Sequence, residues 1–372
     1  MNLPKWPIAG EREIELLREV LASGQWGGFH EIVGRFERCF AAFQQCRWGV
    51  SASNGTVALE MALAVAGLGP GDEVIVPAIS FISTATAVSR VGAVPVFVDI
   101  EPYTFNMDPE RARAAITPKT RAIMVVHFGG PMADMGRFVP LAQEHSLILI
   151  EDAAHAQGSE WSGRRAGGFG LTGSFSFQNG KVMTAGEGGL LTANDDDLAE
   201  RLRAFANQGR KTGENYFYHY TLGTNFRMTA LQAAVLMAQL ERLPEQIQLR
   251  RDNAALLAAE LQGVDGITLQ KPLPEATVQS HYLQLGRIDA PRFGCTRDEF
   301  HRALTEKGIP CTPFYPHALY GNPLYRNADC RVEPCPVAEE CVGDAFWLPH
   351  RVLMSSPETI REIASLIRQI HG

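Results

Sequence analysis

The sequence lacks several features that would place it in a specialised class of protein. It contains no apolar run long enough to span a bilayer, and its first residues lack the apolar segment of a signal peptide. No low-complexity tract appears among the 372 residues, of which 45% are hydrophobic. The formal net charge of −7 argues against nucleic acid as the main partner. We therefore expect a globular cytoplasmic protein that binds neither nucleic acid nor membrane.

Common nucleotide and metal motifs are also missing. The chain has neither the GxGxxG of dinucleotide-binding folds nor the GxxxxGK[ST] of phosphate-binding loops, and it has no internal repeat. Its seven cysteines are an odd number in a long chain, which argues against a disulfide framework. Cys330, Cys335 and Cys341 lie close in sequence, but without the pair spacing of a structural zinc site. We expect ordinary thiols and no bound metal.

Short apolar runs alternate with helical patterns through the first half of the chain. This alternation predicts an α/β fold whose mostly parallel sheet is covered by helices on both faces. In such sheets ligands bind beyond the carboxyl ends of the strands. One strand-like run ends at the carboxylates Glu151 and Asp152. The expected strands are 74–76, 94–98, 122–126 and 147–150, and the expected helices are 12–24, 57–66, 81–91, 109–115 and 134–145.

The pattern changes towards the C-terminal third. A helical stretch runs from about 229 to 243, and Pro244 is expected to break it before a second helix, 246–261. Beyond that point short strands and helices mix, near 282–285, 297–306 and 357–370. We therefore predict a large domain, residues 1–245, and a smaller C-terminal α+β domain, residues 246–372.

Lys181 is the residue that best suggests a cofactor site. It lies between a strand-like run, 174–177, and a glycine-rich stretch, 184–189. A lysine in a partly desolvated site has a lowered pKa, which keeps a neutral amine available for imine formation. An isolated lysine would more often be an ordinary surface residue. In combination with the strand-end carboxylates, Lys181 predicts a Schiff-base lysine for pyridoxal phosphate (PLP).

A carboxylate is needed beside the PLP ring, because the ring nitrogen must stay protonated for the ring to act as an electron sink. Asp152 could pair with that nitrogen and favour its charged form. A plain helix N-cap would use an aspartate equally well. Glu151 competes for the role, but adjacent strand residues point to opposite faces, so only one of the two can face the cofactor.

The phosphate of PLP would bind at the start of the helix expected at 57–66. Asn54, Gly55 and Thr56 precede this helix, and such a start offers free N–H groups, a hydroxyl and the positive end of the helix dipole. The same residues would also serve as a plain N-cap. Ser176, close to Lys181, could supply a second hydroxyl.

Other residues could line the ring and the substrate. Phe81 could stack on the pyridine ring, and the small Ala154 could pack on its other face. Aromatic and histidine residues suit a polyhydroxylated ring by stacking and hydrogen bonding, whereas few cations suited to a nucleotide diphosphate accompany them. The candidate substrate residues are Tyr216, within the run 216–220, Arg227, His281, Tyr282 and His317, and the other available cations are Arg210, Lys211 and Arg351.

With these residues assembled, the chain resembles the DegT/DnrJ/EryC1/StrS aminotransferase family of fold-type I PLP enzymes. The resemblance covers roughly residues 10–370, and Asn54 stands where the family more often has serine. Each motif is weak alone, but their combination is specific. The matching segments are 54–59, 77–81, 151–155, 174–189 and 223–228.

The resemblance implies a role at each matching position. Lys181 would bind PLP covalently and move a proton between substrate and cofactor, while Asp152 would pair with the ring nitrogen. His155 would lie near the cofactor 3-hydroxyl. Asn225 would reach the phosphate bound to a neighbouring subunit, which implies a homodimer with shared sites. The phosphate itself would be held by Gly55, Thr56 and Ser176.

Three functions remain open at this point. The lead-in Gln178-Asn179-Gly180 resembles the branch of 3-amino-5-hydroxybenzoate synthases and cyclitol aminotransferases. The first hypothesis is an aminotransferase that moves an amino group from L-glutamine or L-glutamate to a keto group of a sugar or cyclitol, in secondary-metabolite or polysaccharide biosynthesis. The second is a PLP-dependent dehydratase that aromatises an amino-cyclohexenone to 3-amino-5-hydroxybenzoate. The third is a non-enzymatic PLP-binding regulator.

Overall fold

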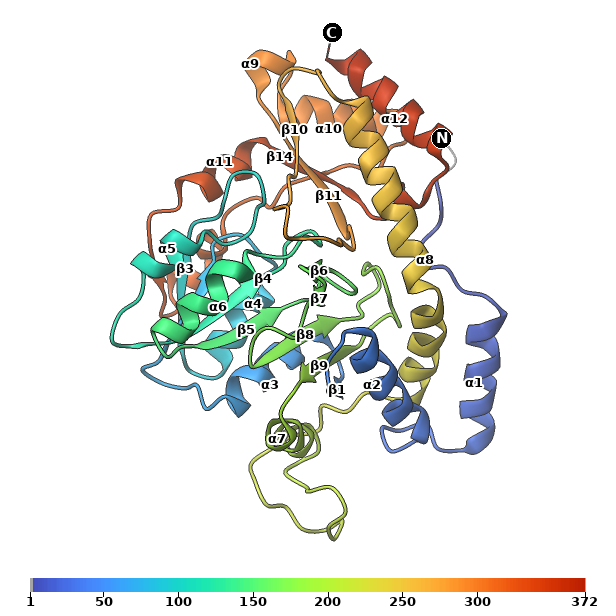
Figure 1. Ribbon diagram of the computed structural model, residues 1–372, viewed down its shortest axis with the longest axis vertical. Helices are drawn as coiled ribbons and strands as arrows, with labels where there is room; N and C mark the ends of the chain where they lie inside the picture. The colour runs from blue at the N-terminus through green and yellow to red at the C-terminus, as the bar shows by residue number, and fades with distance from the viewer. Residues whose placement is uncertain (1–2, 372) are drawn as a thin grey trace.

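The computed structural model describes residues 3–371. A large eight-stranded sheet lies between helices, and a four-stranded sheet with its own helices lies beyond it near the C-terminus (Figure 1). The two sheets are linked by one long helix, α8 (Ala230–Glu260). This α/β architecture confirms the fold class expected from the alternating pattern.

The large sheet is mostly parallel. Parallel pairing joins β5 to β4, β4 to β2, β2 to β3, β3 to β13 and β5 to β8, whereas β9 pairs antiparallel with both β8 and β1. In sheet order the strands are β1 (Trp48–Ala52), β9 (Gly189–Ala193), β8 (Thr172–Ser176), β5 (Ile148–Asp152), β4 (Thr120–Val126), β2 (Glu73–Pro77), β3 (Val94–Val98) and β13 (Arg331–Val332).

Helices cover both faces of this sheet. Because side chains alternate along a strand, Ile75 of β2 packs into one apolar core while Val74 and Val76 pack into the other. The first core also takes residues of α1, α2, α6 and α8, and the second takes residues of α3, α4 and α7. These helices, with the short α5, are α1 (Glu11–Ser23), α2 (Glu31–Phe43), α3 (Gly55–Val65), α4 (Ser83–Arg90), α5 (Pro109–Ala114), α6 (Met135–Glu144) and α7 (Asp196–Ala206).

Pro244 does not break the helix, contrary to the sequence-based expectation. Helix α8 runs without interruption through Pro244 for 31 residues. An interior proline costs about 3 kcal/mol because it removes one hydrogen bond and crowds the preceding turn. Leu243 and Ile247, on either side of it, are buried in the first core, and this packing holds the helix together. The domain boundary near residue 245 falls inside α8 and stays a prediction.

The second sheet is antiparallel and has its own core. Phe293, Phe300 and Phe346 are buried there beside α12, which supports the expected α+β character. In order the strands are β10 (Ile267–Leu269), β11 (Leu283–Ile288), β14 (Ala345–Pro349) and β12 (Thr312–Pro313). Around them lie α9 (Ala290–Phe293), α10 (Arg297–Glu306), α11 (Pro336–Asp344), α12 (Pro357–Ile370) and the 3-10 turns η1 (Leu319–Gly321), η2 (Pro323–Arg326) and η3 (Val352–Met354), while β6 (Glu160–Trp161) and β7 (Arg164–Arg165) form a separate hairpin.

None of the helices within residues 3–371 combines the length with the apolar character that a membrane crossing requires. In the same residues, no group of three or more His, Cys, Asp and Glu side chains is arranged to hold a metal ion. All seven cysteines are free thiols.

Candidate active site

A cavity of about 370 Å³ lies where β5 and β8 end and α3 and α4 begin. Its size is within the range of small-molecule sites. Most of the predicted cofactor residues meet in it although they come from distant parts of the chain. The predicted residues that line it are Asn54, Gly55, Thr56, Phe81, Asp152, Ala154, His155, Ser176, Lys181 and Tyr282.

Asp152 is the last residue of β5 and, of the adjacent carboxylates Glu151 and Asp152, is the one that lines this cavity. The Thr84 hydroxyl donates a hydrogen bond to its Oδ2 at 2.8 Å, and the Ala154 N–H donates to its Oδ1 at 3.2 Å. Burial nevertheless raises the pKa of Asp152 above its usual value. A neighbouring cation would stabilise the charged form of this buried carboxylate, and the protonated ring nitrogen of PLP is such a cation.

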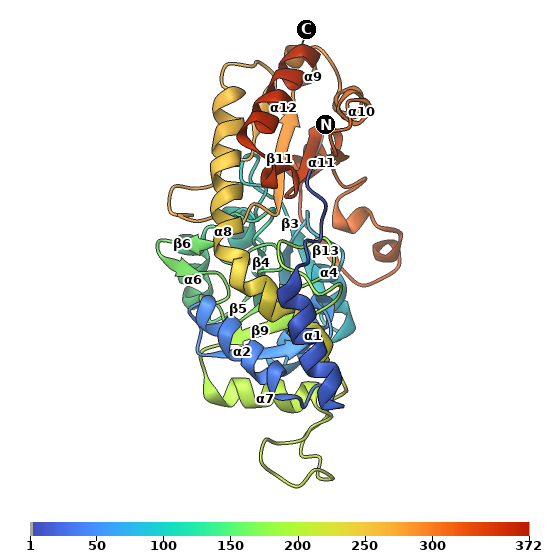
Figure 2. The ribbon, with the colours of Figure 1, turned by 90° about the vertical axis from the view of Figure 1, so that its right-hand side faces the viewer.

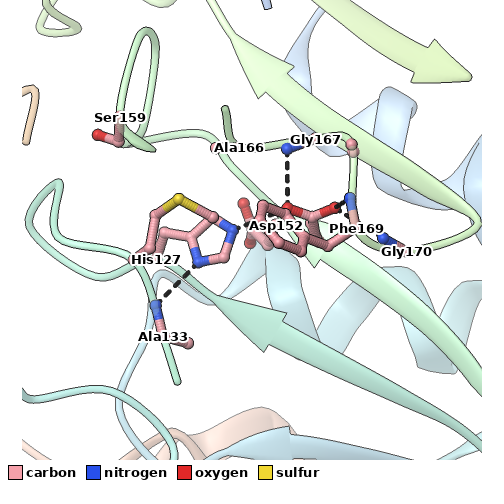
Figure 3. A network of polar contacts seen from close by, with 12 residues as sticks. His127, Ala133, Asp152, Ser159, Ala166, Gly167, Phe169 and Gly170 are labelled. Atoms are coloured by element: carbon pink, nitrogen blue, oxygen red, sulfur yellow. Dashed lines mark hydrogen bonds and ion pairs between the residues drawn. The ribbon is translucent and has the colours of Figure 1, made fainter. Parts of the chain in front are cut away.

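Glu151, the preceding residue of β5, does not line this cavity, in agreement with the alternation of side chains along a strand. Its hydrogen-bond partners include His127, Gly167 and Gly170, which Figure 3 shows close together. Its carboxylate accepts hydrogen bonds from the N–H groups of Gly167, Phe169 and Gly170 at 2.7–2.8 Å. The Nε2–H of His127 donates a fourth at 3.1 Å, while the Nδ1 of His127 accepts from Ala133 N–H. Burial alone would raise the pKa of Glu151, but these hydrogen bonds outweigh it and lower the pKa.

The start of α3 offers a cradle for a phosphate group. The Asn54 side chain caps the helix by accepting from Val57 N–H at 2.9 Å. The N–H groups of Gly55 and Thr56 have no acceptor among the described residues, so they remain available to an anion. A methyl group on Gly55 would lie 2.6 Å from Ser176 Cβ, so only glycine lets helix and strand approach this closely. The cavity therefore fits the phosphate.

Lys181 enters the same cavity from the segment between β8 and β9. Its Nζ lies 4.4 Å from the centre of the Tyr282 ring, over the ring face. Burial lowers the pKa of Lys181 to about 8, against the opposing effect of the Asp152 charge. A substantial fraction of the amine is therefore neutral near pH 8, as imine formation requires.

His155 also packs against the Tyr282 ring. The two ring centroids are 4.3 Å apart, and His155 Nδ1 accepts a hydrogen bond from Gly129 N–H at 3.3 Å. Burial, followed by the Lys181 charge, lowers the pKa of His155 well below its usual value. The ring is thus neutral with its proton on Nε2, from which it can donate one hydrogen bond to an oxygen of the cofactor.

Several site residues were missed by the sequence analysis. Thr84 positions Asp152, and its hydroxyl also bonds the Ser80 hydroxyl at 2.7 Å. Ser83 shares a 2.6 Å hydrogen bond with Thr56 in the cradle. The available signal was the group of hydroxyl residues Ser80, Ser83 and Thr84, which closely follows the strand that ends at Pro77. Gln178 and Glu187 also line the cavity.

Three predicted residues lie in the segment between α7 and α8, outside this cavity. This segment extends away from the body of the protein, below α7 in Figures 1 and 2. Arg227 stacks on Phe29 at 5.0 Å and donates to Asn207 Oδ1 at 2.8 Å. Tyr216 also contacts Phe29, and Asn225 is paired in a β-bridge with Asn207.

Two histidines that the sequence analysis proposed as substrate residues, His281 and His317, also lie outside this cavity. His281 lines a separate cavity of about 360 Å³ between α8 and the second sheet. The neighbouring Tyr282 takes the cofactor side, because His281 adopts a left-handed backbone with φ of 49° and the two side chains diverge. Burial, Arg250 and Arg251 lower the pKa of His281 to about 3. The imidazole of His317 is close to its neighbour's carbonyl, Ala318 O.

The residues that line the cavity fit PLP, because a different group is available for its aldehyde, its ring nitrogen and its phosphate. When bound, PLP supplies an electron sink for negative charge on an adjoining carbon. Lys181 would bind it and carry protons, Asp152 would hold the ring-nitrogen proton, and the first turn of α3 would hold the phosphate. The exposed Phe81 ring is free to cover one ring face.

Comparisons with known proteins agree with this site. The model of the DegT/DnrJ/EryC1/StrS aminotransferase family matches residues 7–368. The chain is 38% identical to a 3-amino-5-hydroxybenzoate synthase of Amycolatopsis mediterranei (strain S699), over 98% of this chain and 96% of that protein. It is 36% identical to an L-glutamine:2-deoxy-scyllo-inosose aminotransferase of Streptomyces kanamyceticus, over 99% and 93%.

The fold comparison points to the same family. A crystal structure of 3-amino-5-hydroxybenzoic acid synthase superposes with a TM-score of 0.94 at 37% identity, covering 99% of this chain and 98% of the other. The Lys181 amine, the Asp152 carboxylate and the open first turn of α3 are all present in one cavity. The chain therefore belongs to the DegT/DnrJ/EryC1/StrS aminotransferase family of PLP-dependent enzymes.

Proposed function

We propose that this enzyme transfers the amino group of L-glutamine or L-glutamate to a keto group on a free sugar or cyclitol. The observation that carries the proposal is the composition of the cavity. Lys181 is its single lysine or arginine among the lining residues, while Glu187 and Gln178 add polar groups suited to hydroxyls and amines. The similarity to a glutamine-dependent inosose aminotransferase supports the same donor and acceptor classes.

The cavity favours a free ring over a nucleotide sugar. Its volume of about 370 Å³ has to hold PLP and the acceptor together. A nucleotide diphosphate calls for guanidinium or ammonium groups. Arg210 and Arg227 lie in the outlying segment, and Arg351 is bonded to Pro4 O, so none of them lines the cavity of its own subunit.

Amino transfer is favoured over aromatisation. The family description and the inosose aminotransferase relative both concern amino transfer, whereas the aromatising reaction rests on the name of one kind of relative. An acidic cyclohexenone would also need a cation for its carboxylate, and Asp152 and Glu187 are the carboxylates that it would meet instead. The third hypothesis, a non-enzymatic regulator, does not explain why Lys181 and Asp152, the groups that PLP catalysis requires, lie together in one cavity.

A half-reaction assay tests this function. The PLP-loaded protein is mixed with L-glutamine or L-glutamate, and the loss of the visible absorbance of the Lys181-bound cofactor is followed. Bleaching by either donor, then recovery with an inosose but not with a nucleotide keto-sugar, is the expected result. Lys181→Ala should abolish both phases. Absence of bleaching with every amino donor, together with turnover of an aminated cyclohexenone, would establish the dehydratase instead.

We also infer that two copies associate through the segment between α7 and α8. Phe217 and Leu222 in this segment are 79% and 92% exposed, and Tyr216, Tyr218 and Tyr220 add to the apolar surface. Such a patch is typical of an interface. A second copy would also bring Asn225 towards a cofactor site that it does not reach in its own subunit. Sedimentation should show a dimer for the wild type and a monomer for Phe217→Glu with Leu222→Glu.

We place this reaction in the cytoplasm. All seven cysteines are unpaired, and four of them are buried. Free thiols persist in the reducing cytosol, whereas secreted proteins tend to pair them.

A further inference from the structure

We propose that Trp6 and His350 are positioning residues for Lys181: they bind the two successive backbone carbonyls that precede the lysine and thereby couple it to both ends of the chain. We call residues 177–188, between β8 and β9, the lysine loop, and residues 3–8 the N-terminal strap. The inference concerns the placement of the Lys181 amine and holds for any acceptor substrate.

Trp6 and His350 each donate one hydrogen bond to the lysine loop. The indole Nε1–H of Trp6 donates to Asn179 O at 3.1 Å, across 173 positions of sequence. Nε2 of His350, the residue that follows β14, contacts Gly180 O at 3.1 Å. The two donor rings also touch each other edge to face, with centroids 4.4 Å apart. The first residues of the chain and the second sheet therefore meet at the lysine loop.

Two held carbonyls constrain more than one would. A peptide group is planar, so fixing the carbonyl direction of Asn179 and of Gly180 orients two successive planes. Gly180 lies between these planes, and glycine has the widest backbone freedom of any residue. Within the loop, Gln178 also holds these planes, because its carbonyl accepts the Lys181 N–H at 2.9 Å and its side-chain Oε1 accepts the Gly180 N–H at 2.8 Å. The contacts of Trp6 and His350 add the anchor from outside the loop, and losing them would loosen the backbone that carries the Lys181 side chain.

The strap that carries Trp6 is itself anchored on both sides. Arg351 Nη1 donates to Pro4 O at 3.4 Å. Gln239 Nε2 and Arg242 Nη2 donate to Ile8 O at 2.8 and 3.0 Å. These donors come from the residue beside His350 and from α8. Trp6 is therefore held in place as a bridge between the second sheet, α8 and the lysine loop.

His350 is in the state that this contact needs. It is 2% exposed, and burial and the nearby Arg250 lower its pKa well below the usual value, so the ring is neutral. Its Nδ1 has no partner among the described residues. A proton on Nδ1 would leave a buried donor unpaired and set a lone pair of Nε2 against the Gly180 carbonyl. The favoured tautomer carries the proton on Nε2 and donates it to Gly180 O.

The contact also joins the rings that surround the lysine amine. His350 stacks on Tyr282 with centroids 6.1 Å apart, and the Lys181 amine stands over the face of that same Tyr282 ring. The backbone N–H of His350 donates to Tyr282 O at 3.1 Å. A shift of His350 would therefore move both the backbone before Lys181 and the ring beneath its amine.

Four substitutions test the proposal in the full-length protein. Trp6→Phe keeps an aromatic ring but deletes the N–H donor. His350→Leu deletes the second donor, whereas His350→Gln keeps an N–H at a similar position. Trp48→Phe is the matched control, since it deletes an indole N–H that donates to Asp196 Oδ1 at 2.7 Å, away from the lysine loop. Thermal unfolding of each variant measures any loss of folding.

The decisive readout is the pKa of Lys181 in the protein stripped of PLP, from competitive acetylation at a series of pH values and mass spectrometry. The wild type should give about 8, governed by burial and Asp152. In Trp6→Phe and His350→Leu the pKa should move up towards its usual value, because a loosened lysine is better solvated. The dissociation constant of PLP should rise about two- to tenfold, the worth of one hydrogen bond.

The controls decide between positioning and general stability. Trp48→Phe should leave the Lys181 pKa and PLP affinity unchanged, and His350→Gln should restore both relative to His350→Leu. The proposal is overturned if Trp6→Phe leaves both quantities at their wild-type values. It is equally overturned if Trp48→Phe shifts them as much, or if His350→Gln is as impaired as His350→Leu. None of these measurements uses an amino acceptor, so they are independent of the proposed substrate.

Discussion

Replacing Glu151 by glutamine should destabilise the fold strongly although the two side chains have nearly the same shape. Each carboxylate oxygen of Glu151 accepts two hydrogen bonds: Oε1 from the N–H groups of Phe169 and Gly170, and Oε2 from Gly167 N–H and His127 Nε2. Either orientation of the glutamine amide would place its NH₂ group against two buried donors. Neither orientation of the amide therefore satisfies all the buried donors around His127, Gly167 and Gly170, which Figure 3 shows.

His127 cannot relieve this conflict without a loss elsewhere. It could offer Nε2 as an acceptor only by moving its proton to Nδ1, and Nδ1 already accepts the N–H of Ala133 at 3.1 Å. Each buried N–H left unpaired costs about 1–3 kcal/mol, and breaking a buried charged contact costs about 3–5 kcal/mol. We expect Glu151→Gln to lower the free energy of unfolding by about 3–5 kcal/mol.

Thermal and urea unfolding at fixed protein and PLP concentrations measure the effect. For a chain of this length the loss corresponds to a fall in Tm of about 4–6 °C. Glu144→Gln is the control, because Glu144 is exposed and contacts Arg113 at the surface, where a substitution changes stability by about 0.5 kcal/mol or less. A Glu151→Gln protein within about 1 kcal/mol of the wild type would refute the reasoning.

The same substitution carries a prediction about pH. The hydrogen bonds lower the pKa of Glu151 in the folded protein, so its charge stabilises the fold fully above the unfolded value of about 4.3. That contribution is lost as the pH falls through the lowered folded pKa. The stability difference between wild type and Glu151→Gln should therefore be constant near neutrality and narrow in acid. A difference that widened on acidification would contradict the assignment.

Three further predictions concern the cofactor site. Gly55→Ala sets a methyl group 2.6 Å from Ser176 Cβ, and relieving that overlap should lower PLP affinity about five- to a hundredfold by equilibrium dialysis. Thr84→Val deletes the 2.8 Å hydrogen bond to Asp152, so the Asp152 pKa should rise further and PLP affinity should fall about tenfold or more. PLP uptake by the stripped protein should accelerate as the pH rises through about 8 and then level off, because the neutral Lys181 amine is the reactive form; stopped-flow absorbance measures it.

Matched observations would contradict these three. Gly343→Ala adds a methyl group with no atom within 4 Å, so it should leave PLP affinity unchanged; an equal loss in both alanine variants would remove the phosphate cradle from the explanation. Wild-type PLP affinity in Thr84→Val would mean that Asp152 does not depend on its hydroxyl partner. An uptake rate that stayed flat between pH 6 and 10 would show that deprotonation of Lys181 does not control it.

Local chemistry was readable in the sequence wherever a residue type and its position in an element sufficed. Asp152 at a strand end and Gly55 at a helix start were predicted as site residues because strand ends and helix N-termini have fixed directions. Side chains alternate along a strand, so only one of the two adjacent carboxylates was expected to face the cofactor, and Asp152 is the one that lines the cavity. The family resemblance rested on the same short segments, and it was confirmed across residues 7–368.

Long-range packing decided the rest. Helix α8 continues through Pro244 because residues on both sides of the proline are buried in the core. Helix propensity describes a residue by itself and does not include this stabilisation by tertiary packing. The side chains of His281 and Tyr282 diverge because His281 has a left-handed backbone conformation, which the sequence analysis did not predict. The contacts of Trp6 and His350 with the lysine loop join positions more than 160 residues apart. Residue chemistry thus determined which groups could serve PLP, while tertiary packing determined which of them meet, since distance in space does not follow distance along the chain.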